Sequence, residues 1–415
     1  MKIIKHYSFV FICLIASYIL IALAANLLPD KIIHKNIEKS INTYGDLSTD
    51  CDFVFVHKRN ALTDNFSENI IINQAFCGGK DDLLTSMFLN PRGYKEGQEE
   101  WQNLHQTVNH VGDLDVEYYP SYWHGNTFVM RFLFMFAGYT QLKAFFYFIS
   151  TLLLFCALYL IARRISAWAA LLTLLGMLCV NIYMMQFSIQ ALPVLFIGLV
   201  AAIWVIYHNK EDERIPTMFF IVGSATAFFD LLTCPLITWG IPMCTWIMLQ
   251  RNTHEGKRWI ELITHWVKVS ILWVLGYAIT WFSKWVIGTA VTKTNVYAIG
   301  LEKLLFRSSV SDEFSRIGAL QLNLSMVERT FVIAVVIILV LLAVRFFNRK
   351  GIKTAVLLAF VATVPVAWYL FGANHSYIHY FFTYRTLMVT LISGFLALGC
   401  LIDWSRIPLL KKLHG

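Results

Sequence analysis

Residues 119–164 read "YPSYWHGNTFVMRFLFMFAGYTQLKAFFYFISTLLLFCALYLIARR". Within this stretch, residues 140–162 are an apolar run long enough to cross about 30 Å of hydrocarbon as a helix. The run ends at Arg163 and Arg164, and paired cations are typical of the cytoplasmic end of a membrane span. The segment before it, residues 126–139, is apolar except for Arg131 and too short to span, so we expect a helix lying in the outer interface.

The rest of the chain has the same apolar character. It has 415 residues, of which 57% are hydrophobic and 14% are charged, whereas soluble chains carry about 25% charged residues. This composition excludes an ordinary soluble enzyme. We predict an all-α polytopic membrane protein with about ten transmembrane helices, at residues 7–28, 140–162, 166–184, 189–207, 216–232, 235–250, 260–284, 329–346, 353–371 and 380–402.

The positive charges predict how these helices are oriented. Each connection on the N-terminal side of the membrane carries at least two Lys or Arg residues, including Lys210 and Arg214 in one loop and Lys411 and Lys412 in the tail. Cytoplasmic connections have this pattern, so we predict a multi-pass membrane protein with both termini in the cytoplasm. The net charge of +8 is spread over short connections, which argues against a nucleic-acid partner.

This orientation divides the chain into five parts. The first is interpreted as an uncleaved signal anchor, although its charged start and apolar core are also typical of a signal peptide. The large first extracytoplasmic loop is acidic, since residues 29–126 contain 15 acidic and 8 basic residues. The parts are the anchor at 1–28, the first loop with its interfacial helix at 29–139, transmembrane helices 2–7 at 140–284, a second external loop at 285–328, and transmembrane helices 8–10 with a short cytoplasmic tail at 329–415.

The catalytic candidates are acids, because the sequence lacks the motifs of soluble enzymes such as a nucleophile elbow, a P-loop or HExxH. Asp64 lies in "TDNFSE", and Asp115 and Glu117 lie in "DLDVE", on one side of the chain if that stretch is extended. A carboxylate can act as a general base on an attacking hydroxyl, and paired acids can hold a divalent metal. The alternatives are a solvated acidic surface or, for Asp64, a helix cap.

Three cations are candidates for binding a phosphate. Arg131 lies in the interfacial helix, Lys284 at the outer end of its helix, and Arg385 at the start of the last helix. Cations at this depth can clamp the phosphate of a lipid-linked substrate. The alternative is ordinary snorkelling of side chains that flank a membrane helix.

Histidine and tyrosine side chains accompany these cations. His124 lies in "YYPSYWHG", among aromatic residues typical of the headgroup level, and "NHSYIHYFFTYR" contains Tyr377 and His379. We expect hydrogen bonds to a phosphate or a sugar hydroxyl, or simple interfacial packing. His375 and His379 are four residues apart and could ligate a metal, but no helical carboxylate lies beside them.

Two further features have open interpretations. Asp230 falls inside a predicted span, so it is either functional or paired with a neighbouring helix. Cys51 and Cys77 are the cysteines of the predicted external loops, and they form either a disulfide or two separate thiols.

Several of these stretches resemble the GT-C superfamily of integral-membrane glycosyltransferases, which use polyprenyl-phosphate-linked sugars. The resemblance covers about 160 residues, and its most telling part is residues 119–164, where a Tyr-Pro-led short helix and a Gly-Tyr turn lead into a helix that ends in Arg-Arg. "DNFSE", "YWHG" and "HSYIHYFFTYR" are also similar to phrases in bacterial membrane proteins associated with surface polysaccharide.

The resemblance implies roles for particular residues. The catalytic base would be an acid of the first external loop, which here is Asp64 or a member of the Asp115 and Glu117 pair. The superfamily's acid pair usually follows the first helix directly, where this chain has only Asp30. The residues that would hold the lipid phosphate are Arg131, Lys284 and Arg385.

We therefore expect an enzyme that transfers a sugar from a polyprenyl-phosphate-linked donor to a glycan or lipid-linked polymer acceptor at the outer face of the bilayer. One alternative is an O-antigen-type polymerase or ligase, which shares the lipid donor. Others are a transporter or flippase of lipid-linked sugars, and a scaffold that binds a partner through its first loop. No cofactor is expected beyond a divalent metal that the acids could hold.

Overall fold

The structure is a computed structural model that describes residues 2–51, 59–79, 82–208 and 214–407. Lys210, Lys411 and Lys412, which contributed to the predicted orientation, lie outside the described residues. Within those residues the chain is almost entirely helical, and its strands are two short segments that pair with each other. The predicted helical class is confirmed.

The elements run from a first apolar helix through an external module to a helical bundle. The N-terminal third comprises α1 (Lys2–Asn26), α2 (Asp30–Asn42), η1 (Arg59–Ala61), α3 (Asn65–Cys77), α4 (Leu83–Leu89), β1 (Pro91–Tyr94), α5 (Glu100–Asn109), β2 (Asp115–Tyr118) and α6 (Gly125–Phe134). The middle comprises α7 (Tyr139–Arg164), α8 (Ala167–Leu178), α9 (Ile182–Phe187), α10 (Leu192–His208), α11 (Arg214–Phe229), α12 (Leu236–Leu249), η2 (Arg251–Thr253) and α13 (Trp259–Thr292). The C-terminal part comprises α14 (Val296–Ser308), α15 (Arg316–Ser325), α16 (Arg329–Arg345), η3 (Arg349–Gly351), α17 (Ile352–Phe371), α18 (Ala373–Ile378), α19 (Tyr380–Thr383), η4 (Tyr384–Thr386), α20 (Leu387–Cys400) and η5 (Trp404–Arg406).

Among the described residues, five helical segments are long and apolar enough to cross a membrane, or six if the bent pair α15 and α16 counts as one. The five are Ile3–Asn26, Tyr139–Arg164, Trp259–Thr292, Arg349–Phe371 and Tyr380–Cys400. The segments α8, α10, α11 and α12 are apolar but shorter, at 12 to 17 residues, which is about 18 to 26 Å of helix. A lipid bilayer is thus the environment of the chain, while the predicted total of ten spans goes beyond what these lengths establish.

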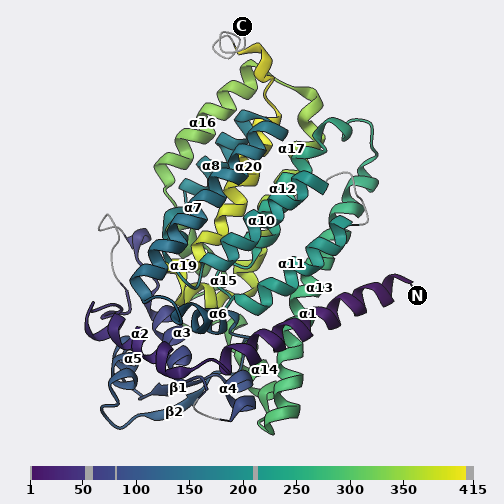
Figure 1. Ribbon diagram of the computed structural model, residues 1–415. Coiled ribbons are helices and arrows are strands. Elements are labelled where there is room, and N and C mark those ends of the chain that lie inside the picture. The colour runs from purple at the N-terminus through teal and green to yellow at the C-terminus, as the bar shows by residue number, and fades with distance from the viewer. Residues whose placement is uncertain (1, 52–58, 80–81, 209–213, 408–415) are drawn as a thin grey trace.

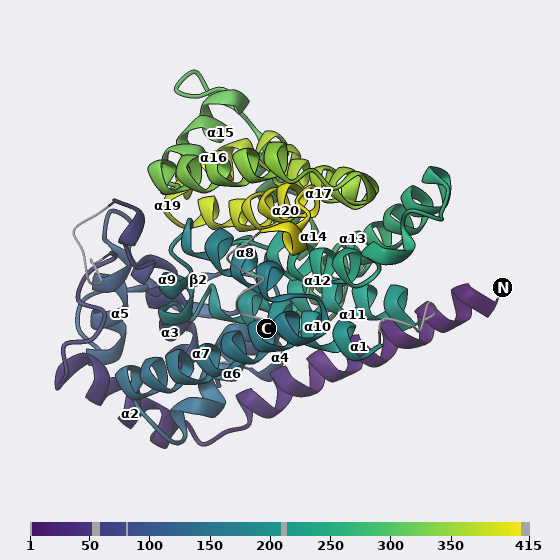
Figure 2. The ribbon, with the colours of Figure 1, turned by 90° about the horizontal axis from the view of Figure 1, so that it is seen from above.

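The membrane helices form a bundle with a folded module at one end (Figure 1). The helices α7, α8, α10, α12, α16, α17 and α20 run side by side, and α2 to α6 with the two strands lie below them in that view. Seen from above, α16, α17 and α20 gather on one side of the molecule and α1 lies along the opposite side (Figure 2). The residues predicted as the first external loop therefore form a module that caps one end of the bundle.

Close packing of α11 against α13 depends on two glycines. A Cβ at Gly223 would lie 2.1 Å from the Trp273 carbonyl oxygen, and one at Gly276 would lie 2.1 Å from the Phe220 carbonyl oxygen. Backbones can approach this closely only where a side chain is absent. The helix α13 has 34 residues and continues to Thr292, about two turns beyond the predicted boundary at residue 284.

The external module has a core of its own. Buried side chains of α2, α3 and α5, such as Ile37, Phe76 and Leu104, pack together beside the two-stranded sheet of β1 and β2. In that sheet β1 and β2 are antiparallel, and Arg92 lies opposite Glu117. The segment predicted as an interfacial helix, residues 126–139, contains α6, which ends at Phe134, and the first residue of α7; its interfacial position stays a prediction. Cys51 and Cys77 are not joined by a disulfide, and the Cys77 thiol donates to Asn73 Oδ1 (3.5 Å).

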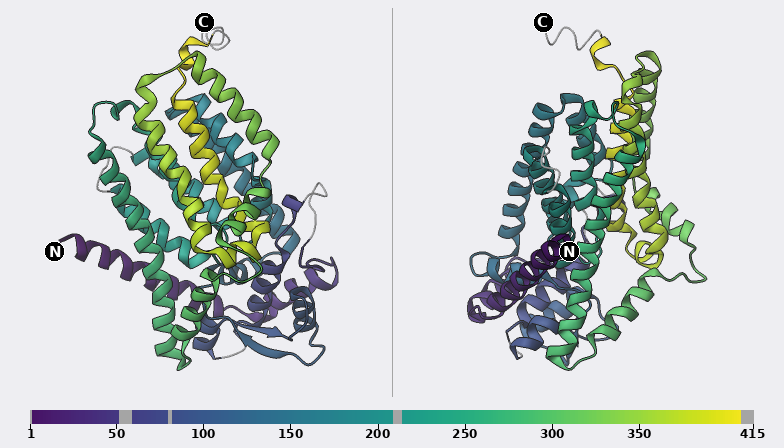
Figure 3. Two further views of the ribbon diagram at one scale, coloured as in Figure 1. Left: turned by 180° about the vertical axis from the view of Figure 1, so that it is seen from behind. Right: turned by 90° about the vertical axis from the view of Figure 1, so that its right-hand side faces the viewer.

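The first helix crosses the bundle obliquely. His6 Nε2 lies 3.1 Å from Thr217 Oγ1, and the Tyr18 hydroxyl lies 3.0 Å from Ser224 Oγ, so α1 runs alongside α11. The N-terminal end of α1 lies about halfway along the bundle, whereas η5 lies at the end opposite the external module (Figure 3). The cytoplasmic location of both termini stays a prediction.

Candidate functional site

The external module forms hydrogen bonds with the bundle through Asn60, in the short η1 turn. The Tyr384 hydroxyl donates to Asn60 O (2.8 Å), while Asn60 Nδ2 donates to Met326 O (3.1 Å) and to Glu328 Oε1 (2.9 Å). Asn181 Nδ2 also donates to Asn60 O (3.2 Å). These contacts hold η1 against the segments that contain Asn181, Glu328 and Tyr384. Asn60 is therefore close in space to Arg385, which follows Tyr384 in the sequence.

Asp64 lies just beyond this turn and is the N-cap of α3. Its Oδ1 accepts a hydrogen bond from Ser67 N (3.2 Å), as the capping alternative predicted. The side chain is buried, at 3% exposure, and its Oδ2 has no hydrogen-bond partner among the described residues. Burial raises the pKa of Asp64 to about 7, the Ser67 hydrogen bonds oppose this, Glu68 adds to it, and the Arg385 guanidinium lowers it.

Arg385 is the cation whose charge lowers the pKa of Asp64. It is 3% exposed, its Nη1 donates to Phe381 O (3.3 Å), and its guanidinium lies 4.9 Å from the centre of the Tyr384 ring. Neither Nε nor Nη2 has a hydrogen-bond acceptor within the described part of the chain. A buried acid and a buried cation thus each retain unused hydrogen-bonding capacity, which is a costly arrangement and is typical of a binding site.

Asp230 adds a second buried acid to this region. The sequence places it inside a span, but α11 ends at Phe229 and Asp230 follows it directly. Its Oδ1 accepts from Thr233 N (2.9 Å), whereas its Oδ2 finds no donor among the residues described. Cys234 lies within the electrostatic influence of both Asp230 and Arg385.

A basic group lies close by, on a helix of the second external loop. Arg307 of α14 donates from Nη1 to His379 Nε2 (2.7 Å), and its Nε has no acceptor in the described chain. One turn earlier, Lys303 Nζ lies 5.5 Å from the centre of the Tyr119 ring. Burial lowers the pKa of Lys303, and the neighbouring charge of Arg307 adds to this effect. The sequence analysis did not select Lys303 or Arg307, although their spacing of four residues places both on one helical face.

The two histidines of this region are neutral hydrogen-bonding groups. His375 Nε2 donates to Leu232 O (2.8 Å), which leaves its Nδ1 as a buried acceptor without a donor in the described residues. Burial, together with Arg307 and Lys303, lowers the pKa of His379 to about 3. No group of three His, Cys, Asp or Glu side chains suited to a metal occurs among the described residues.

Arg131, a predicted phosphate ligand, forms a buried structural link instead. It is fully buried, and its donors reach Ala25 O (2.9 Å), Ala75 O (2.5 Å), Gly78 O (2.8 Å) and Asp30 Oδ1 (2.6 Å). These bonds join the ends of α1 and α3 to α6. Because the guanidinium is enclosed by these partners, a phosphate has no access to it.

Lys284 and His124 lie in a separate aromatic cluster. Lys284 is fully buried, donates to Met87 O (3.2 Å) and lies over the rings of Phe88 and Trp123, at 5.0 and 5.4 Å. His124 Nε2 donates to Tyr119 O (2.8 Å), and burial followed by the charge of Lys284 lowers the pKa of His124 to about 3. This cluster fixes the position of residues 118–125 against α4 and α13.

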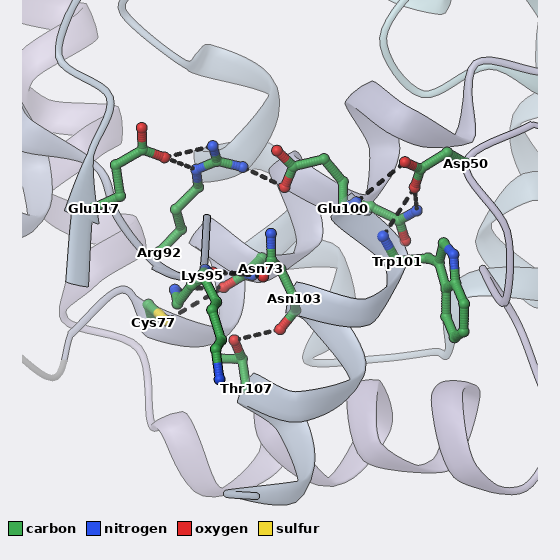
Figure 4. A network of polar contacts seen from close by, with 12 residues as sticks. Asp50, Asn73, Cys77, Arg92, Lys95, Glu100, Trp101, Asn103, Thr107 and Glu117 are labelled. Carbon is green, nitrogen blue, oxygen red and sulfur yellow. Dashed lines mark hydrogen bonds and ion pairs between the residues drawn. The ribbon is translucent and has the colours of Figure 1, made fainter. Parts of the chain in front are cut away.

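The acids of β2 belong to the surface and to an ion-pair network (Figure 4). Asp115 is exposed, whereas Glu117 accepts from Arg92 Nε (2.7 Å). Arg92 also forms an ion pair with the buried Glu100, and Asp50 accepts from the backbone nitrogen atoms of Glu100 (3.1 Å) and Trp101 (2.8 Å). The side chain of Glu117 thus neutralises Arg92 and stabilises the external module. Glu117 acts on Lys303 through its negative charge.

The remaining candidate, Tyr377, stacks on Phe314, with the ring centres 4.2 Å apart. It packs α18 against the second external loop rather than joining the buried charges. Of the predicted set, Asp64 thus lies within the electrostatic influence of Arg385, and His379 contacts Arg307, a residue that the sequence analysis did not select. Comparison with protein-family models, with curated proteins and with solved structures finds no match to this chain.

Proposed function

We propose that the chain is a membrane glycosyltransferase of the GT-C type, which moves a sugar from a polyprenyl-phosphate carrier to a glycan or lipid-linked polymer at the outer face of a bacterial cell membrane. The observation that carries the proposal is that Asp64 and Arg385 are both buried and both keep hydrogen-bonding atoms without a partner among the described residues, while the charge of Arg385 acts on Asp64. Both residues lie near the contacts of Asn60 with Tyr384 and Glu328, where the external module meets the bundle and where a water-soluble acceptor would meet a lipid-borne donor.

Asp64 is the proposed general base. The acceptor hydroxyl oxygen forms a bond to the anomeric carbon of the sugar, the bond from that carbon to the phosphate oxygen breaks, and Asp64 takes the hydroxyl proton. A base works best when its pKa lies near the operating pH, and the pKa of Asp64 is about 7. The exposed Asp115 and the ion-paired Glu117 lack this environment.

The cations supply the complementary charge. Cleavage releases polyprenyl phosphate, and negative charge grows on its oxygen atoms as the bond breaks. Arg385 and Arg307 each have a guanidinium nitrogen without an acceptor among the described residues, so they can stabilise that charge. Lys303 lies beside them at the outer surface.

The position of these groups favours transfer over transport. A transporter of lipid-linked sugars binds its substrate near the middle of the membrane. Here the acids and cations gather at one end of the bundle, through contacts such as those of Asn60 with Tyr384 and Glu328. An O-antigen-type polymerase or ligase uses the same lipid-linked donor as the proposed glycosyltransferase. The two enzymes are distinguished by the glycan that they make.

The test compares the surface glycan of cells that lack the chain with that of cells restored by wild type, Asp64→Asn or Asp115→Asn. We expect loss of one sugar substituent, with full restoration by wild type and by the exposed Asp115→Asn control. Asp64→Asn should restore less than one hundredth of the transfer rate, since removal of a general base costs about 10²- to 10⁴-fold.

Other outcomes decide between the alternatives. A change in polymer length, rather than the loss of a side sugar, would identify a polymerase. An unchanged glycan in cells without the chain, or full restoration by well-expressed Asp64→Asn, would refute the proposed enzyme.

A further inference from the structure

A second polar site lies at the far end of the bundle, between α12 and α13. Its cavity has a volume of about 160 Å³ and is lined by residues of α12, α13, α17 and the connection between α12 and α13. Because a water molecule occupies about 30 Å³ of liquid, this space is large enough for a phosphate-sized group. The site is separate from Asp64, since α12 begins beside Asp230 and the cavity lies at its other end.

Four indole side chains show where α12 and α13 separate. Toward the middle of the bundle, Trp239 Nε1 donates to Ser270 Oγ (3.2 Å) and Trp273 Nε1 donates to Thr238 Oγ1 (3.1 Å). At the cavity, Trp246 and Trp266 have buried Nε1 atoms with no acceptor among the described residues. Trp246 is only 4% exposed. An indole N–H can only donate, so both groups require an acceptor from a bound molecule.

The rim of the cavity is positively charged. Lys257 lines it and is exposed, while Lys353 Nζ donates to Glu255 O (2.9 Å) and Lys257 O (2.6 Å), which fixes the connection in place.

The other titratable groups at the cavity do not cancel this charge. Glu261 lines the same rim, but its carboxylate is paired with Arg258 (2.6 Å). His254 Nδ1 lies 2.8 Å from Thr354 Oγ1, and burial together with Lys257 and Lys353 lowers the pKa of His254 to about 4, so this ring is neutral at pH 7.

We propose that this cavity binds the phosphate group of an anionic headgroup, held by the indole N–H groups of Trp246 and Trp266 and by the ammonium group of Lys257. A phosphate offers several acceptor oxygens and a negative charge, which match two donors without acceptors and one cation. The cavity lies at the membrane end where the sequence predicts cytoplasmic connections, so an anionic phospholipid of that leaflet can enter from the bilayer. A soluble phosphate would use the same contacts.

The experiment measures thermal unfolding of the full-length protein in detergent while phosphatidylglycerol, phosphatidylcholine or inorganic phosphate is titrated in. Phosphatidylglycerol should raise the melting temperature of the wild type, whereas phosphatidylcholine should not. Lys257→Gln and the double variant Trp246→Phe, Trp266→Phe should each need about tenfold more phosphatidylglycerol, because each removes contacts to the charged phosphate. Lys350→Gln, an exposed cation on the neighbouring η3, is the matched control and should titrate like wild type.

The outcomes separate the two sources of phosphate and can overturn the proposal. If inorganic phosphate raises the melting temperature and competes with the lipid, the site is supported and its ligand is soluble. If only phosphatidylglycerol acts, the site is supported as a lipid site. Equal effects of both phospholipids, or wild-type titrations in both Lys257→Gln and the tryptophan variant, would overturn it. Sugar transfer is not measured, so the result is independent of the proposed enzyme.

Discussion

Replacing Asp64 by Asn should make the folded protein more stable at pH 8 while it abolishes the proposed activity. The pKa of the carboxyl is about 7 in the folded chain and 3.8 in a solvated reference. Each pKa unit corresponds to 1.36 kcal/mol, so keeping an ionised Asp64 in its buried site costs about 4 kcal/mol of folding stability. Asn is as good an N-cap as Asp, so α3 keeps its Ser67 hydrogen bond.

The sign of this effect depends on pH. Below pH 3.8 the carboxyl is neutral in both the folded and the unfolded chain, and the substitution has no electrostatic effect. Between pH 3.8 and about 7 the unfolded chain releases its proton while the folded chain retains it, so the stability of the wild type falls as pH rises. Above about pH 7 the carboxyl is ionised in both states, and the stability of the wild type does not fall further through Asp64. The advantage of Asp64→Asn should therefore grow from near zero at pH 4 to its full value at pH 8.

Unfolding of the purified protein in detergent, followed by tryptophan fluorescence at pH 4, 6 and 8, measures this advantage. Asp115→Asn is the matched control, since Asp115 is exposed on β2 and should show no comparable dependence. A melting temperature of Asp64→Asn that equals or falls below that of wild type at pH 8 would contradict the buried, unpaired state of the Asp64 carboxylate.

Three further substitutions test other parts of the structure. Arg92→Met should cost about 3–5 kcal/mol of unfolding free energy, because Glu100 is left as a buried charge without a partner; adding Glu100→Leu should recover part of it, and chemical unfolding measures both. Gly276→Ala should cost about 1–3 kcal/mol or prevent folding, whereas Gly394→Ala, whose Cβ would meet no atom within 4 Å, should melt like wild type. Arg307→Gln should raise the KM for a polyprenyl-phosphate donor about tenfold if Arg307 binds its phosphate, and an unchanged KM in a steady-state transfer assay would exclude that role.

The residues of the candidate site were only partly predictable. The motif "TDNFSE" identified Asp64 as a base or a cap, and in the structure it is a cap whose second oxygen has no partner among the described residues. The sequence around Arg131 predicted a phosphate ligand in the same way, yet the guanidinium of Arg131 donates to backbone carbonyls and to Asp30. Sequence spacing cannot separate these cases, because the partners of both side chains come from distant segments.

The sequence by itself determined the helical membrane class, since long apolar runs bounded by cations leave the chain few other ways to satisfy its backbone in lipid. Only the tertiary structure decided that Asp64 and Arg385 are both buried, that Arg307 reaches His379, and that two indoles of α12 and α13 lack acceptors among the described residues. The physical reason is that the charge state and hydrogen bonding of a buried group depend on what surrounds it in space, and these surroundings are assembled from both halves of the chain.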